Sequence, residues 1–112
     1  MSSSGNVGIG RSPTAVGSYK MLELDGPSGG YIRNYVNGTL TGYWYTGSGA
    51  SGFGTATSTP LTFDTSNSEA MRIDSSGNLL VGKTASSLAN DGFQVHNTGY
   101  ILSLKQITRR QR

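Results

Sequence analysis

The sequence has no cysteine and only one histidine among its 112 residues. Without cysteine the chain forms no disulfide and offers no thiolate ligand, and a single histidine builds neither a catalytic triad nor a zinc site within one chain. We therefore expect no metal and no cofactor. One alternative stays open, because three copies of His96 around a threefold axis would gather enough imidazoles for a metal.

Large apolar residues are also scarce. Leu, Ile, Val and Phe together make 22 of the 112 residues, whereas Ser, Thr and Gly make 45. The net charge is only +3, so charge repulsion does not prevent collapse. Glycine loses much entropy on ordering, and a chain this short buries a modest fraction of its surface alone. We therefore expect a marginal monomer and an obligate oligomer, most simply a homotrimer.

Long apolar runs are absent as well. No stretch approaches the roughly 20 apolar residues that a membrane helix needs, and Met1–Gly5 is polar, without the apolar core of a signal peptide. The sequence therefore predicts no membrane insertion.

Positive charge is concentrated at the C-terminus, in Arg109, Arg110 and Arg112. Contact with nucleic acid or another anionic surface is one interpretation, and a solvated tail is the other. No aromatic platform or recognition helix accompanies these arginines, so we expect no nucleic-acid partner.

A short phrase occurs twice in this chain. Residues 3–10 read SSGNVGIG, and residues 75–82 read SSGNLLVG, at a spacing of 72 residues. A basic residue and then a hydroxyl residue follow each copy, Arg11–Ser12 in the first and Lys83–Thr84 in the second. The repetition indicates a structural unit.

The second copy also matches the phosphate-binding pattern GxxxxGK[ST] through Gly77, Gly82, Lys83 and Thr84. Such a loop joins a buried strand to a helix, but residues 79–81 are bulky and suited to a strand, and only 85–89 could follow as a short helix. We interpret the match as coincidental and expect no nucleotide and no enzyme. Residues 47–52 match GxGxxG and are likewise interpreted as a loop.

Two carboxylate pairs are the remaining candidates for catalysis: Glu23 with Asp25, and Glu69 with Asp74. Neither pair has a neighbouring apolar pocket readable from the sequence that would raise one pKa, so glycosidase chemistry is not favoured.

Alternating apolar residues predict short strands near 6–10, 19–25, 31–36, 40–45, 61–63, 71–73, 93–96 and 100–104. Asn37-Gly38 predicts a hairpin, because both residues tolerate positive φ, and 64–69 predicts a second one. We expect an all-β fold of short strands and hairpins with Gly-rich turns, in an intertwined homotrimeric fibre or knob. The expected organisation is 1–46, an N-terminal repeat unit and hairpin; 47–59, a flexible or extended connector; and 60–112, a second hairpin and C-terminal repeat unit with the basic tail.

Two groups of residues are candidates for contacts with partners. The expected inter-chain core contains Val7, Ile9, Leu79, Val81, Met71 and Ile73. The candidate glycan contacts are Tyr43, Trp44 and Tyr45, of which alternation places the two tyrosines on one face and the tryptophan on the other. Packing in a trimer core and stacking on a sugar are the alternatives for this run.

Several phrases resemble those of tail-fibre and related structural proteins of tailed bacteriophages. They are GNVGIG at 5–10 with Ser12-Pro13 after it, and MRIDSSGN at 71–78 with the strand PLTF at 60–63 before it. The resemblance implies β-rich homotrimeric shafts and knobs without cofactor or catalysis.

The function that this resemblance implies is that of a virion structural protein in a tail fibre or other projecting fibre, used for attachment or display. The implied partners are copies of itself, other virion proteins and a host-surface glycan. The implied location is the virion, after assembly in the host cytoplasm. The alternatives are a head decoration or capsid-associated fibre protein, and a carbohydrate-binding adhesin module.

Overall fold

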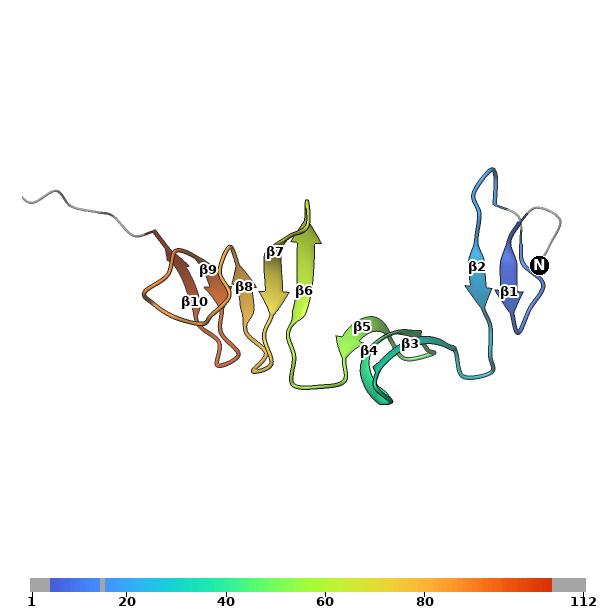
Figure 1. The fold of residues 1–112 in the computed structure, drawn as a ribbon, viewed down its shortest axis with the longest axis horizontal. Helices are drawn as coiled ribbons and strands as arrows, with labels where there is room; N and C mark the ends of the chain where they lie inside the picture. The colour runs from blue at the N-terminus through green and yellow to red at the C-terminus, as the bar shows by residue number, and fades with distance from the viewer. Residues whose placement is uncertain (1–4, 15, 106–112) are drawn as a thin grey trace, which may run out of the picture. The chain divides into compact units, whose positions relative to one another are not determined.

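A computed structural model describes residues 5–14 and 16–105, and within them it contains ten β-strands and no helix (Figure 1). The expected all-β class is therefore confirmed. The chain divides into two compact units, Met1–Thr57 and Ser58–Arg112. The Arg109–Arg112 tail lies outside the described residues.

The first unit begins with a pair of short parallel strands, β1 (Val7–Ile9) and β2 (Leu22–Leu24). Val7 lies opposite Leu22, and Ile9 lies opposite Leu24. The connection between them is held by an ion pair between Arg11 and Glu23, with 2.9 Å between Nε and Oε2. The alternating pattern had predicted both strands but not their direction.

The second sheet of the first unit is antiparallel and consists of β3 (Gly30–Val36), β4 (Thr39–Thr46) and β5 (Ser51–Thr55). Asn37 and Gly38 have φ angles of 48° and 78° and form the two-residue turn between β3 and β4. This is the hairpin that Asn-Gly predicts, because both central residues of such a turn need positive φ.

Strand β5 corrects the expected connector at 47–59. Residues 47–50 form a turn in which the Gly47 N–H donates to the Ala50 carbonyl, and Ser51–Thr55 then pairs with β4. Its glycines lie under aromatic rings of β4: a Cβ on Gly54 would be 2.7 Å from Cζ of Tyr43. A cross-strand ring compensates for the missing side chain of a strand glycine, so a Gly-rich segment is ordered here as a strand.

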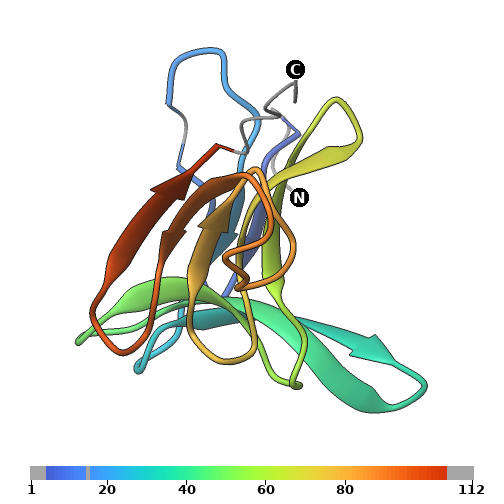
Figure 2. The ribbon, with the colours of Figure 1, turned by 90° about the vertical axis from the view of Figure 1, so that its left-hand side faces the viewer.

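The second unit is one antiparallel sheet in which each strand pairs with the next along the chain (Figure 2). Its strands are β6 (Leu61–Thr65), β7 (Ser68–Ile73), β8 (Leu79–Val81), β9 (Gly92–Val95) and β10 (Ile101–Leu104). The β6–β7 hairpin was predicted with residues 64–69 as its loop. The turn is shorter, because Ser66 and Asn67 alone take positive φ, at 51° and 59°. The helix considered at 85–89 does not form, and turns and bends occupy that segment.

The core of the described residues is very small. Leu80, on β8, is the one buried hydrophobic residue among them, and its cross-strand neighbour Gln94 is also buried. Within the chain the buried side of β8 is therefore the one that carries Leu80, and Val81 on the other side is 36% exposed. The sequence places Leu79 and Val81 in an inter-chain core, and that placement stays a prediction.

Candidate functional site

From its first glycine onward, at 5–10 and 77–82, the repeated phrase forms a similar local structure in both copies. Asn6 and Asn78 are both buried, and each side-chain Oδ1 accepts a hydrogen bond from a backbone N–H of the neighbouring strand region. The donor is Met21 N in the first copy, at 3.1 Å, and Asn97 N in the second, at 2.9 Å. Because a buried donor without a partner is costly, each asparagine fixes the strand beside it.

In the second copy Asp74 organises the turn before β8. Its carboxylate accepts hydrogen bonds from Ser76 N, Asn78 N and Asn78 Nδ2 at 3.0, 2.9 and 2.8 Å. Burial raises the pKa of this carboxyl, but these hydrogen bonds and the charge of His96 outweigh it and hold the pKa below its ordinary value. The segment Asp74–Asn78 is thus a turn that is stabilised by hydrogen bonds among its own residues.

The residues of the phosphate-loop match do not form a phosphate cradle. Strand β8 occupies the loop position between Gly77 and Gly82, and it pairs with β7 and β9. The Lys83 ammonium is largely buried and donates to the carbonyls of Ser87 and Asn90 at 2.6 and 3.3 Å.

The depression beside Lys83 is lined by the carboxylate residues Glu69 and Asp91 as well as by Thr84. Two carboxylates disfavour a phosphate at close range. Lys83 therefore stabilises the loop that follows it, through its hydrogen bonds to Ser87 and Asn90.

One face of the second unit's sheet carries two continuous rows of side chains. Cross-strand neighbours share a face, and the register gives a first row of Leu61, Ile73, Leu79, Val95 and Ile101. The second row contains Phe63, Met71, Val81, Phe93 and Ser103. We call these ten residues the two-row face.

The two-row face contains four of the six residues expected in an inter-chain core: Met71, Ile73, Leu79 and Val81. The other two, Val7 and Ile9, lie on β1 in the first unit. The sequence reasoning missed Leu61, Phe63, Phe93, Val95 and Ile101 as members of the same face, although their alternation was visible. Only the register shows that they align.

The opposite face of this sheet carries an ion pair next to a bulge. Arg72 donates to Glu69 through Nε and Nη2 at 2.5 and 2.6 Å. Ala70 has no partner in the β6–β7 register, so it forms a β-bulge in β7. The extra residue places the side chains of Glu69 and Arg72, which are three positions apart, on the same side of the strand. The Arg72 hydrogen bond lowers the pKa of Glu69. The Glu69 carboxylate is therefore held by Arg72.

The two tyrosines of the candidate glycan run lie on one face of the first unit's second sheet. Tyr43 and Tyr45 have ring centroids 5.9 Å apart, and Tyr31 stacks on Tyr45 at 5.5 Å. The Arg33 guanidinium lies 5.0 Å from the Tyr31 ring centre. This cluster covers Gly52 and Gly54 of β5.

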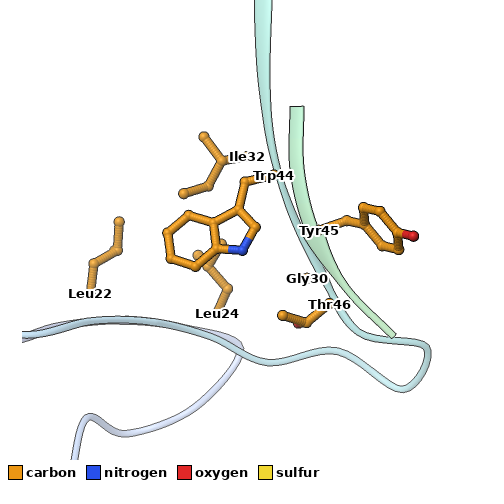
Figure 3. A pocket seen from close by; sticks show the side chains of 7 residues that line it. All are labelled: Leu22, Leu24, Gly30, Ile32, Trp44, Tyr45 and Thr46. Carbon is orange, nitrogen blue, oxygen red and sulfur yellow. The ribbon is translucent and has the colours of Figure 1, made fainter. Parts of the chain in front are cut away.

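Trp44 lies on the other face, so the three candidate residues do not form one site. Its indole stacks on Phe53 of β5 at 5.2 Å, and both rings are well exposed, at 48% and 68%. Figure 3 shows the indole near Leu22, Leu24 and Ile32, with Tyr45 on the far side of the strand. An apolar cavity of about 210 Å³ lies among these side chains. Phe53 was missed because it stands between glycines in the segment expected to be a connector.

The remaining candidate residues have ordinary structural partners. Glu23 pairs with Arg11 and also accepts a hydrogen bond from Thr14 N at 2.7 Å, while its neighbour Asp25 is exposed. His96 stacks on Tyr100 at 4.4 Å and contacts the Thr98 hydroxyl through Nδ1 at 2.7 Å.

Over the described ranges 5–14 and 16–105, no group of three His, Cys, Asp or Glu side chains is arranged to hold a metal. The same ranges contain no helix long and apolar enough to cross a membrane. No family model matches the chain, and neither a curated protein nor a solved structure is significantly similar to it.

Proposed function

We propose that this chain is a structural protein of a bacteriophage virion, and that it forms part of a tail fibre or another projecting fibre used for attachment or display. It works as a homotrimer without cofactor or catalysis, is assembled in the host cytoplasm and contacts other virion proteins. The resemblance of its repeated phrases to those of tail-fibre proteins supports the phage assignment.

The observation that carries the self-association is the imbalance between buried and exposed apolar side chains. In the described part of the chain one hydrophobic residue is buried, whereas sixteen large ones are exposed. Fully burying a Val, Leu, Ile, Phe or Met side chain contributes about 1.5–3 kcal/mol, so isolated units of this kind have little to stabilise them. Identical neighbours supply the missing interior, and a rigid β-rich assembly then displays its outer loops.

Native mass spectrometry across a dilution series tests this proposal. We expect a trimer at micromolar concentration and loss of the folded state on dilution, because assembly and folding are linked. A well-folded single subunit at nanomolar concentration would contradict the proposal. Electron microscopy of particles carrying a label on the C-terminus tests the location, and a label absent from every projecting fibre would contradict the fibre assignment.

A second candidate function is carbohydrate binding, which the exposed Trp44–Phe53 stack favours. Aromatic rings with an open face stack on sugar rings, and a host-surface glycan is a natural ligand for an attachment fibre. A glycan array with Trp44→Ala tests this function, with Tyr31→Ala on the opposite face as the control. Binding that Tyr31→Ala retains and Trp44→Ala loses supports it, and equal binding by both variants opposes it.

A further inference from the structure

The turn between β3 and β4 consists of Asn37 and Gly38, and both residues are exposed. Within the ranges 5–14 and 16–105, neither the Asn37 side chain nor the Gly38 N–H has a hydrogen-bond partner. A Cβ built on Gly38 would meet nothing within 4 Å, so the space beside this residue is open. A carboxamide and the backbone nitrogen that follows it are therefore both unoccupied at this hairpin tip.

A carboxamide and the next backbone nitrogen react with each other in water. The Gly38 nitrogen gives up its proton and bonds to Cγ of Asn37, while the bond from Cγ to Nδ2 breaks and ammonia leaves with that proton. The product is a five-membered succinimide ring. Water then adds to one of the two ring carbonyls and breaks the C–N bond there, which leaves either aspartate or isoaspartate. Glycine favours the attack, because it has no side chain to hinder its nitrogen.

The structure separates Asn37 from other asparagines of the chain. Asn6 and Asn78 are buried, and their side chains are held by hydrogen bonds. Asn97 donates through Nδ2 to the carbonyl of Ser76 at 2.6 Å. Breaking the bond from Cγ to Nδ2 at any of these sites would also remove a structural contact, which is not the case at Asn37.

The closest counterpart is Asn67, which also takes positive φ in a two-residue turn, between β6 and β7. The two asparagines occupy different places in their turns. Asn37 comes first, so the attacking nitrogen belongs to the second turn residue, Gly38. Asn67 comes second, so the attacking nitrogen belongs to Ser68, which begins β7 and pairs with Thr65. Ring closure at Asn67 therefore disturbs the strand pairing, whereas ring closure at Asn37 is confined to the turn.

We propose that Asn37 is a site of spontaneous deamidation, selected by its place in the turn. Both products make the hairpin tip anionic. Aspartate keeps the turn, because Asp-Gly favours the same two-residue geometry as Asn-Gly. Isoaspartate adds one methylene to the backbone, so the pair of Val36 and Thr39 loses its matched turn. Whether or not the chain belongs to a fibre, this exposed tip changes its charge and shape as the molecule ages.

Peptide mapping by mass spectrometry, after incubation of the full chain at physiological temperature and mildly alkaline pH, tests the proposal. We expect the peptide with Asn37 to gain the mass that separates a carboxyl from a carboxamide and to split into two forms. An isoaspartyl methyltransferase, which labels isoaspartate and not aspartate, identifies the second form. Conversion at Asn37 should be at least about tenfold faster than at Asn67 in the same sample, because the Gly38 nitrogen is unhindered. No conversion at Asn37, or equal rates at the two sites, would overturn the proposal.

The variant Ser68→Gly separates the effect of the turn from that of the dipeptide. It gives Asn67 a following glycine as well, but the attacking nitrogen still belongs to a strand residue. In the folded variant we expect Asn67 to remain at least about fivefold slower than Asn37, because the strand must open locally before the ring can close. In urea, where the pairing is lost, the two sites should react at similar rates. Equal rates in the folded variant would overturn the selection of Asn37 by its place in the turn.

Discussion

The two copies of the repeated phrase share most of their residues, yet they lie in different sheets. In the first copy β1 has one parallel partner, β2, whereas in the second copy β8 lies between two antiparallel partners, β7 and β9. Both copies bury the asparagine, and both place their glycines at positive φ: Gly5 and Gly10 in one, Gly77 and Gly82 in the other. The phrase therefore specifies a buried amide and a short strand, and its neighbours specify the direction of pairing.

The asparagine explains how the same phrase can begin a strand that pairs in parallel and a strand that pairs antiparallel. It precedes the strand and bonds to whichever backbone N–H lies beside it. That donor precedes β2 in the parallel pair, at Met21, and follows β9 in the antiparallel pair, at Asn97. A single side-chain acceptor does not distinguish the two directions, since it needs one correctly placed N–H only.

The largest expected difference between the copies is at the glycine that ends each phrase. A Cβ on Gly10 would be 1.8 Å from the Asp25 carbonyl oxygen, whereas a Cβ on Gly82 meets nothing within 4 Å. We expect Gly10→Ala to destabilise the β1–β2 pair by about 3 kcal/mol or more, since backbone must move. Gly82→Ala should cost only about 1–2 kcal/mol, because the alanine must adopt the positive φ angle of this position. Hydrogen exchange at the Asp25 and Gly82 amides measures both, and equal losses would contradict this account.

The next largest effect concerns the residue in the middle of each strand, which is Gly8 in the first copy and the buried Leu80 in the second. Leu80→Ala should cost about 2–5 kcal/mol because it leaves a cavity beside the one hydrophobic residue that is buried within the described chain. Leu88→Ala, at a 70% exposed loop position of the same unit, is the control and should cost less. Urea denaturation at one fixed protein concentration measures both variants. A loss for Leu80→Ala no larger than that for Leu88→Ala would contradict the burial of Leu80.

A smaller effect is expected at the buried asparagines. Asn78→Ala leaves the Asn97 N–H without its acceptor, and Asn6→Ala does the same to the Met21 N–H, at about 1–3 kcal/mol each. Asn78→Ala also removes the hydrogen bond that its Nδ2 donates to Asp74. Exchange protection of the Asn97 and Met21 amides reports each site. If both stay protected in the alanine variants, the asparagines do not fix the neighbouring strands.

The smallest effect concerns the dependence of the second copy on pH. The folded-state pKa of Asp74 is lowered, so its contribution to stability is present above the unfolded-state pKa of about 3.9 and is lost as pH falls through the folded-state value below that. Asp74→Asn should therefore be less stable than the wild type at pH 6 and should approach it near pH 2. Urea midpoints over this range measure the difference. A constant difference would mean that Asp74 acts without its charge.

Several features of the fold were predictable from short segments. Asn37-Gly38 predicted its hairpin because few residues tolerate positive φ, and alternation correctly separated Tyr43 and Tyr45 from Trp44. The context of the phosphate-loop match also predicted a strand at Leu79–Val81, where β8 forms.

Other features depend on partners far away in the sequence. Strand β5 is rich in glycine, and it is ordered because tyrosine rings from β4 lie over Gly52 and Gly54. The loop between β6 and β7 was predicted too long, because Ser66-Asn67 is a less obvious turn than Asn-Gly. The exposed partner of Trp44 proved to be Phe53, which lies in the segment expected to be a connector.

The sequence by itself determined the all-β class, the positions of the main turns and the local structure of the repeated phrase, because these depend on φ preferences and on neighbours within a few residues. Only the tertiary structure decided the direction in which β1 and β8 pair, the register that aligns the two-row face and the side of β8 that is buried. In a strand, successive side chains point to opposite faces of the sheet. A shift of the pairing register by one residue therefore exchanges the buried face of the strand for the exposed one. That choice depends on strands distant in the chain, which no local pattern encodes.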